Sequence, residues 1–524
     1  MNADFGPSPY SNYAYACLTA NALRTPDRIA LTYRGGPGLT YAELDRRVNR
    51  RANALLSAGV KAGQRVASLL NKTIGVAEVY LAEIKIGAVV AALNPYWDDD
   101  VLTQVVAKSG CTAFVYDGDA DDLVARIAPG LPGITTWLRV GGGDGRGADL
   151  DALGAHAGDA EPPLGAFGND VAALFYTSGT TGLPKAVAHT HLSCLATAHL
   201  WLDLPHDDDS VFGTGAIIWG VGFTAIAGPA LYAGMRLVLE DDWGPANVLT
   251  VAPRERVTHM SVIPSFFAQM FGENAHEGAD LSALRVLVLG GEPIAPSLLE
   301  RIKLRLPDAG VYCYYGQTEA PYSCMGRLDD GSQDLRSVGR ARTGVAVRVT
   351  DPHGRRVVGE VGELNLTGPH MMAGYDGEPG LTAQAVRDGW YVGGDLGRVD
   401  ADGFVYVLGR RADAIVKSGR WTQPVQIEEV ALTLDGVAEA GAVGVPEDAD
   451  EQRILLAVSP RAGASLNAGA LRAELAARLP DHQRPDAVVI AAELPHTQDA
   501  SGGRGKLLRR DLRTRYADHL DTPT

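Results

Sequence analysis

A short run of small, hydroxyl-bearing residues closed by a lysine has the chemistry of a polyphosphate-binding loop. It reads Tyr-Thr-Ser-Gly-Thr-Thr-Gly-Leu-Pro-Lys over residues 176–185 and follows an apolar stretch. Gly179 and Gly182 let backbone N–H groups approach phosphate oxygens without a Cβ in the way, and Lys185 supplies positive charge. Further donors are the hydroxyls of Thr177, Ser178, Thr180 and Thr181. We therefore predict that this loop binds a triphosphate.

The loop differs in spacing from the Walker A motif. Its lysine follows Gly182 by three positions, so Gly-x-x-x-x-Gly-Lys-Ser/Thr does not occur here. An isolated stretch of this composition is more often a solvated linker. Segments elsewhere in the chain decide against the linker interpretation.

Several further segments combine glycine turns, aromatic residues and charges. In chain order they are Leu-Thr-Tyr-Ala-Glu-Leu (39–44), Thr-His-Met-Ser-Val-Ile-Pro (258–264), Leu-Gly-Gly-Glu-Pro (289–293), Tyr-Tyr-Gly-Gln-Thr-Glu (314–319), Gly-Trp-Tyr-Val-Gly-Gly-Asp (389–395), Tyr-Val-Leu-Gly-Arg (406–410) and Gly-Lys-Leu-Leu-Arg-Arg (505–510). With the loop, and in this order, they resemble the adenylate-forming superfamily and its AMP-dependent acyl-CoA synthetases. The resemblance spans nearly the whole chain and implies ATP-dependent activation of a carboxylic acid as its acyl adenylate.

The resemblance implies a nucleotide site built from several of these segments. The loop holds the β- and γ-phosphates of ATP, and Thr318 donates to the α-phosphate or the adenylate. Glu319 holds Mg²⁺, with Thr177 as a second candidate ligand. Asp395, accompanied by Arg410, binds the ribose hydroxyls. The adenine side is assigned to Gly291, Glu292, Pro293, Tyr314, Tyr315 and Gly316, because an aromatic ring there can stack on the base.

The resemblance also implies two half-reactions served by a rotating C-terminal lobe. Lys506 bridges the carboxylate and the α-phosphate during adenylation, and the rotated lobe then forms a thiol tunnel beside Gly419 for CoA. The chain departs from the family pattern at the insert 498–504, at Ala412 in place of the usual hinge acid, and at Arg420 and Trp421 near the tunnel. These departures concern the second half-reaction.

The segment that corresponds to the acid pocket contains no acidic residue over 213–223. The ammonium of an α-amino acid would be buried there without a partner, so an α-amino acid substrate is disfavoured. His189 and His191 alternate after the loop, and a pocket role and a place near the surface both stay open. The candidate pocket residues, each equally compatible with core packing, are Trp219, Val221, Phe223 and Tyr322.

We therefore predict an acid–CoA ligase for an apolar or aromatic carboxylic acid, with ATP, Mg²⁺ and CoA as its small-molecule partners. One alternative is an adenylating enzyme with another acceptor, such as a carrier-protein thiol, an amine or an unusual nitrogen or oxyacid nucleophile. The other alternative is a nucleotide-binding regulatory protein without turnover.

The composition predicts a soluble, cytoplasmic enzyme without a nucleic-acid partner. The 524 residues exceed one ordinary domain, and 63 acidic against 47 basic side chains give a net charge of −16. No apolar run is long enough to span a bilayer, and the first twenty residues do not read as a signal peptide. The five cysteines form no Cys-x-x-Cys pair and are expected to be buried, small apolar residues.

The elements that must position these residues follow an α/β pattern. Helical periodicity at 41–58 and 74–86 alternates with apolar strands at 65–70 and 88–93, which predicts layered parallel sheets. We expect a large N-terminal AMP-binding lobe over 1–410, with a β-rich subdomain at about 335–410, and a small mobile α+β lobe over 411–524. Residues 141–165 lack periodicity and predict an irregular surface loop.

Overall fold

The computed structural model describes residues 8–71, 73–177, 183–207, 211–213, 222–242, 244–270, 279–292, 294, 296–351, 353–447, 451–461, 463–498 and 504–520. The chain forms two compact units. Unit 1 comprises residues 1–347, 366–393 and 403–405, and unit 2 comprises 348–365, 394–402 and 406–524. The predicted α/β class is confirmed, whereas the predicted boundary near residue 410 stays a prediction.

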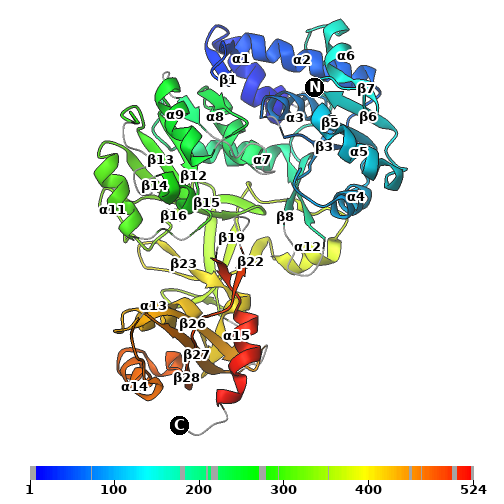
Figure 1. Ribbon diagram of the computed structural model, residues 1–524. Coiled ribbons are helices and arrows are strands. Elements are labelled where there is room, and N and C mark those ends of the chain that lie inside the picture. The colour runs from blue at the N-terminus through cyan, green and yellow to red at the C-terminus, as the bar shows by residue number, and fades with distance from the viewer. Residues whose placement is uncertain are drawn as a thin grey trace, which may run out of the picture. The chain divides into compact units, whose positions relative to one another are not determined.

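Unit 1 contains two large sheets (Figure 1). The first has the order β20 (Gly374–Tyr375), β9 (Lys185–Thr190), β8 (Val171–Thr177), β4 (Val89–Ala92), β3 (Arg65–Leu69), β5 (Ala113–Asp117), β6 (Thr136–Val140) and β7 (Ala148–Asp149). Its strands from β8 to β7 are parallel, and β9 and β20 add an antiparallel edge. Strands β4 and β5 are buried throughout and apolar except for Asp117 at the end of β5, as expected for parallel strands covered on both faces.

The second sheet has the order β16 (Arg340–Ala341), β15 (Ala320–Arg327), β14 (Gly310–Gln317), β13 (Val286–Gly290), β12 (His259–Val262), β10 (Val211–Gly213), β11 (Arg236–Leu239), β1 (Ile29–Tyr33) and β2 (Leu39–Thr40). The strands from β14 to β1 are parallel, and the outer pairs are antiparallel. The β14–β15 hairpin therefore lies where the parallel part of the sheet gives way to antiparallel strands.

Helices cover both faces of each large sheet. One core joins the two sheets through α2 (Tyr41–Ser57), α3 (Thr73–Lys85), α7 (His191–Trp201) and α8 (Gly228–Tyr232). The other face of the β9 sheet carries α4 (Asp99–Lys108) and α5 (Asp121–Ile127). The other face of the β14 sheet carries α9 (Pro245–Glu255), α10 (Pro264–Met270) and α11 (Pro296–Arg305). Shorter elements are η2 (Tyr15–Thr19), α1 (Ala20–Arg24), η6 (Phe223–Ala227) and α12 (Pro379–Ala385).

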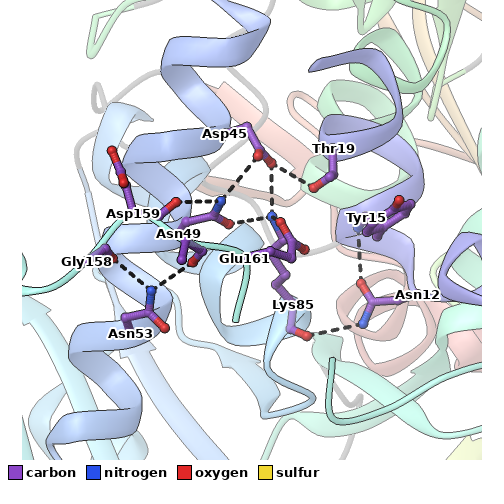
Figure 2. Close-up of polar contacts among 11 residues, drawn as sticks. Asn12, Tyr15, Thr19, Asp45, Asn49, Asn53, Lys85, Gly158, Asp159 and Glu161 are labelled. Atoms are coloured by element: carbon purple, nitrogen blue, oxygen red, sulfur yellow. Dashed lines mark hydrogen bonds and ion pairs between the residues drawn. The ribbon is translucent and has the colours of Figure 1, made fainter. Parts of the chain in front are cut away.

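The prediction of an irregular loop over 141–165 is wrong for residues 148–156. These residues form β7 and α6 (Leu150–His156), and α6 packs against α2, whereas 141–147 and 157–165 form no helix or strand. Figure 2 shows how the stretch after α6 is attached to the rest of unit 1 through Glu161. The buried Lys85 ammonium contacts Glu161 Oε2 at 2.8 Å, and it also contacts Asp45 Oδ1 at 2.9 Å and Asn49 Oδ1 at 2.5 Å. Asn53 also donates to two backbone carbonyls of this segment. These contacts join residues that are distant in sequence, so hydrophobic periodicity along the chain could not predict them.

The six-stranded sheet has the order β18 (Arg356–Val357), β17 (Ala346–Thr350), β19 (Gly362–Thr367), β22 (Trp390–Val399) and β21 (Val386–Arg387), with β23 (Val405–Arg410) paired to β22. It confirms the predicted β-rich character of this region. The residues of β17, β19, β22 and β23 are divided between the two units.

The rest of unit 2 is the predicted α+β arrangement. A sheet of β26 (Val437–Val445), β27 (Arg453–Pro460) and β28 (Ala487–Ile490) packs α13 (Pro424–Leu432) and α14 (Ala468–Arg478) on one face and α15 (Arg509–Tyr516) on the other. Two hairpins accompany it: β24 (Ile415–Lys417) with β25 (Arg420–Thr422), and β29 (His496–Gln498) with β30 (Arg504–Leu507).

Two expectations from composition can be compared with the structure. All five cysteines are free and buried, as predicted. Among the described residues, no helix is both long enough and apolar enough to cross a membrane.

Candidate active site

The predicted phosphate loop joins two antiparallel strands. Thr177, the last residue of β8, pairs with Lys185, the first residue of β9, so the loop is the connection of a β-hairpin. The candidate donors Ser178, Gly179, Thr180, Thr181 and Gly182 lie outside the described residues. The hairpin brings Lys185 back to the end of the strand that precedes the loop.

The Thr318–Glu319 pair forms the turn of the β14–β15 hairpin in the other sheet. Gly316 is required there, because a Cβ at this position would lie 2.4 Å from the backbone nitrogen of Tyr322. Tyr322 itself has φ of +53°, a conformation that bulky residues rarely adopt. The backbone of the predicted motif is therefore tightly packed at its turn.

Tyr375, which no sequence motif singled out, contacts both of these parts of unit 1. Its strand β20 pairs with β9, which places Tyr375 opposite Val187. Its hydroxyl donates to Glu319 Oε1 at 2.7 Å, and its ring centroid lies 5.3 Å from the Lys185 ammonium. Burial and the neighbouring Glu319 carboxylate raise the pKa of Tyr375, so the hydroxyl stays protonated as a donor. No local signal marks Tyr375, because its role depends on β20 pairing with β9.

Glu319 is chemically suited to a magnesium ion. Its side chain is buried, and its carboxylate accepts a hydrogen bond from the uncharged hydroxyl of Tyr375. The same residues contain no group of three His, Cys, Asp or Glu that could hold a metal. Mg²⁺ is commonly held by one or two carboxylates together with substrate phosphates, which fits a single buried carboxylate near a phosphate loop. The assignment of Thr177 as a second ligand stays a prediction.

The adenine-side residues lie around the ends of β13 and β14. Gly291 adopts φ of +82°, and both carboxylate oxygens of Glu292 accept hydrogen bonds from Ser265 at the start of α10. The ring centroids of Tyr314 and Tyr322 lie 4.3 Å apart, and the two ring planes are tilted by 34°. Tyr315 is half-buried in β14, and Pro293 lies outside the described residues. The stacking of a base on one of these rings stays a prediction.

The two histidines after the loop are both buried, with 2% of His189 and none of His191 exposed. The interpretation that they lie near the surface is therefore wrong. His189 lies in β9 and reaches the Thr318 carbonyl, whereas His191 begins α7 and accepts a hydrogen bond from the backbone of Tyr13. Burial lowers the pKa of each imidazole to about 4, so both are neutral at pH 7.

The candidate acid-pocket residues are only partly described. Trp219 and Val221 lie outside the described residues. Phe223 is fully buried and packs edge-on against Tyr80, and Tyr322 packs against Trp201. Their role in binding an acid stays a prediction.

In unit 2, the predicted ribose-binding pair is in contact. Arg410 Nε lies 3.1 Å from Asp395 Oδ1, with Asp395 nearly buried and Arg410 half exposed. Lys506 lies in β30 and Gly419 in the turn between β24 and β25, where its φ is +64°. The insert before Lys506 connects β29 to β30, and Ala412 lies in a short 3₁₀ turn, η7 (Arg411–Asp413). The roles of these residues stay predictions.

Models of known protein families match the N-terminal and the C-terminal part of the chain. The family model for AMP-binding enzymes matches residues 18–376, and the model for the AMP-binding enzyme C-terminal domain matches residues 426–500. A feruloyl-CoA synthase from Amycolatopsis sp is 33% identical over 491 residues, 92% of this chain and 95% of that protein. ATP-bound MatB from Rhodopseudomonas palustris superposes with a TM-score of 0.81 at 26% identity, covering 97% of this chain and 99% of that one. The amide bond synthetase McbA from Marinactinospora thermotolerans superposes with a TM-score of 0.80 at 26% identity, covering 97% of this chain and 100% of that one.

Proposed function

This chain belongs to the AMP-binding enzyme family of ATP-dependent, AMP-forming ligases, and from that membership we propose that it joins an apolar or aromatic carboxylic acid to CoA. Ligation of an acid to CoA follows from the family and its relatives. The class of the acid and the role of each residue are the proposed parts.

One contact pattern supports the proposed residue roles most strongly. Tyr375 touches both Lys185, the candidate phosphate ligand, and Glu319, the candidate magnesium ligand. These residues come from different sheets, and their shared neighbour has the lysine over its ring and the carboxylate at its hydroxyl. A lysine and a metal-binding carboxylate held in this way suit the transfer of a nucleotidyl group, where positioned charges stabilise the transition state.

In the proposed first step, a carboxylate oxygen of the acid attacks the α-phosphorus of ATP. The bond to the β-phosphate breaks, and acyl-AMP and pyrophosphate form. Lys185 and the loop hold the phosphates, Thr318 donates to the α-phosphate or the adenylate, and Lys506 bridges the acid and the α-phosphate. Mg²⁺, held by Glu319, would supply positive charge to the phosphate oxygens. In the second step, the thiol sulfur of CoA attacks the acyl carbonyl, and AMP leaves.

The absence of an acidic residue over 213–223 favours an acid without an α-ammonium group. Such a group would be desolvated without a counter-charge. The likeness to a feruloyl-CoA synthase supports an aromatic acid.

A second acceptor deserves a direct test, because the chain also resembles an amide bond synthetase over its full length. An amine acceptor would keep the adenylation step and change only the nucleophile. Ala412, Arg420 and Trp421 depart from the family pattern in the part of the chain assigned to the acceptor step.

The decisive experiment measures ATP–pyrophosphate exchange with aliphatic, benzoic and cinnamic acids. The sharpest pair is 3-phenylpropanoic acid and phenylalanine, which differ only in the amino group. We expect exchange with the first and much less with the second. Adding CoA, a carrier protein or an amine separately, and following AMP release, then identifies the acceptor. Exchange that occurs with phenylalanine but not with 3-phenylpropanoic acid would contradict the proposed acid class. If none of the tested acids supported exchange, the result would favour the alternative of a nucleotide-binding protein without turnover.

A further inference from the structure

One face of β9 points toward the Thr318–Glu319 turn. Side chains alternate along a strand, so Lys185, Val187 and His189 lie on the same face. Val187 packs in a cluster with Ala320 and Tyr375, which fixes the direction of this face. The strand that begins with the candidate phosphate-binding lysine therefore presents His189 near the other end of the same face.

His189 reaches across to the turn in the other sheet. Its Nε2 lies 2.7 Å from the Thr318 carbonyl oxygen, and its Nδ1 lies 3.1 Å from Ser193 Oγ. A carbonyl only accepts, so Nε2 carries the hydrogen and donates to Thr318. Burial lowers the pKa of the ring to about 4, so Nδ1 is unprotonated at pH 7 and can only accept from Ser193.

At both residues of the turn, the backbone carbonyl has a hydrogen-bond partner from another segment of unit 1. His189 donates to the Thr318 carbonyl, and the backbone N–H of Met372 donates to the Glu319 carbonyl at 2.8 Å. The hairpin backbone is closely packed at Gly316, where a Cβ would lie 2.4 Å from the backbone nitrogen of Tyr322. Loss of the His189 hydrogen bond would leave the Thr318 carbonyl without this partner and free the turn to shift.

We propose that His189 is a positioning residue for adenylation, which holds the Thr318 carbonyl and thereby aligns Thr318 and Glu319 with the strand that carries Lys185. This inference rests on the proposed function, because alignment matters only if these three residues serve one reaction. Their alignment should contribute to the transition state more than to the binding of ATP.

Three substitutions of His189 separate hydrogen bonding from packing. The amide nitrogen of glutamine can replace Nε2, that of asparagine can replace Nδ1, and leucine keeps bulk without a donor. We expect His189→Gln to retain most exchange activity. His189→Asn and His189→Leu should lower kcat for pyrophosphate exchange about tenfold, the loss expected for one hydrogen bond, with little change in KM for ATP.

The neighbouring buried histidine provides the matched control. His191 accepts from the backbone N–H of Tyr13 at 3.1 Å and does not contact the turn in the described structure. The series His191→Gln, His191→Asn and His191→Leu should change thermal stability without the kcat pattern expected at His189. Equal kcat for His189→Leu and His189→Gln would overturn the proposal. So would a decrease in kcat that is proportional to the loss of thermal stability in both the His189 and the His191 series.

Hydrogen–deuterium exchange gives a second measurement that does not need turnover. In the full-length protein, the backbone amides of residues 316–322 should exchange faster in His189→Leu and His189→Asn than in wild type, and near the wild-type rate in His189→Gln. Unchanged exchange in His189→Leu would show that the turn is held without His189 and would contradict the proposal. If the wild type showed no pyrophosphate exchange with any acid, the proposed function would fail, while amide exchange would still decide whether His189 holds the turn.

Discussion

The phenolic hydroxyl of Tyr375 donates a 2.7 Å hydrogen bond to Oε1 of Glu319. The two residues belong to different sheets of unit 1, and the ring of Tyr375 also faces the ammonium of Lys185 at 5.3 Å. A single aromatic side chain therefore restrains a carboxylate through its hydroxyl and a lysine through its ring. The hydroxyl contact can be removed while the ring is kept.

Tyr375→Phe removes the hydroxyl and keeps the ring. A hydrogen bond to a charged group contributes about 1.5–3 kcal/mol, so we expect at least a tenfold loss of pyrophosphate exchange and a higher Mg²⁺ requirement. Tyr375→Leu should lose more, because the aromatic face beside Lys185 disappears as well. Glu319→Gln, which removes the charge itself, sets the lower limit and should reduce exchange by orders of magnitude while the protein stays folded. A Tyr375→Phe enzyme with wild-type rate and Mg²⁺ dependence would contradict this role.

Asp395→Ala tests the proposed ribose site. Without the carboxylate the ribose hydroxyls lose an acceptor, so KM for ATP should rise while KM for the acid changes less. Arg410→Gln removes the partner at 3.1 Å but leaves the carboxylate, so its effect should be smaller. Steady-state kinetics of pyrophosphate exchange measure both constants. An equal rise of the two Michaelis constants would indicate a general disturbance of the fold instead.

Lys506→Ala should separate the two half-reactions. We expect loss of pyrophosphate exchange, with thioester formation from supplied acyl-AMP and CoA largely kept. Gly419→Leu should do the reverse by obstructing the thiol. Since Gly419 has φ of +64°, Gly419→Asn is the control, because asparagine tolerates this backbone better than other residues do. Loss of both half-reactions in Lys506→Ala would refute a role confined to adenylation.

Four buried histidines predict a loss of stability in mild acid. Burial lowers the pKa of His189, His191, His259 and His370 to about 4 each, against about 6.5 in the unfolded chain. The unfolded state therefore binds more protons between these values, and the free energy of unfolding should fall as the pH drops from about 6.5 toward 4.

Replacing one of these histidines isolates its share of the pH dependence. In urea unfolding at several pH values, His189→Gln should reduce the slope of unfolding free energy against pH by up to about 1.4 kcal/mol per pH unit. The matched control is His156→Gln, since His156 is exposed to water in the folded protein. An unchanged slope in His189→Gln would show that this ring takes up a proton in the folded state.

Lys85→Met should destabilise unit 1. The Lys85 side chain is 1% exposed and contacts Asp45, whose side chain is 12% exposed, so the substitution leaves a nearly buried carboxylate without its cation (Figure 2). Breaking such a pair from one side costs about 3–5 kcal/mol. Arg50→Met removes the exposed pair with Asp159 and should cost less than about 1 kcal/mol. Similar urea midpoints for the two variants would contradict this difference.

Features that depend on neighbouring residues can be predicted from the amino-acid sequence. The glycines, hydroxyls and lysine of the loop, the Tyr-Tyr-Gly-Gln-Thr-Glu segment and the alternation of helices and strands are all visible within short windows. Local composition and periodicity set turns, strands and helices, so the α/β class followed from them. The buried state of the cysteines followed from their apolar character.

Contacts between residues that are distant in sequence become visible only in the folded protein. The pairing of β20 with β9 brings Tyr375 into contact with Glu319 and Lys185. One face of β9 lies toward the β14–β15 turn, so His189 contacts the Thr318 carbonyl. The ordered helix α6 in a segment without periodicity depends on packing against α2, and the adjoining segment depends on the Lys85 contacts. Such contacts arise from strand pairing and from the burial of charges between distant segments. They leave no local pattern, because their partners are far apart along the chain.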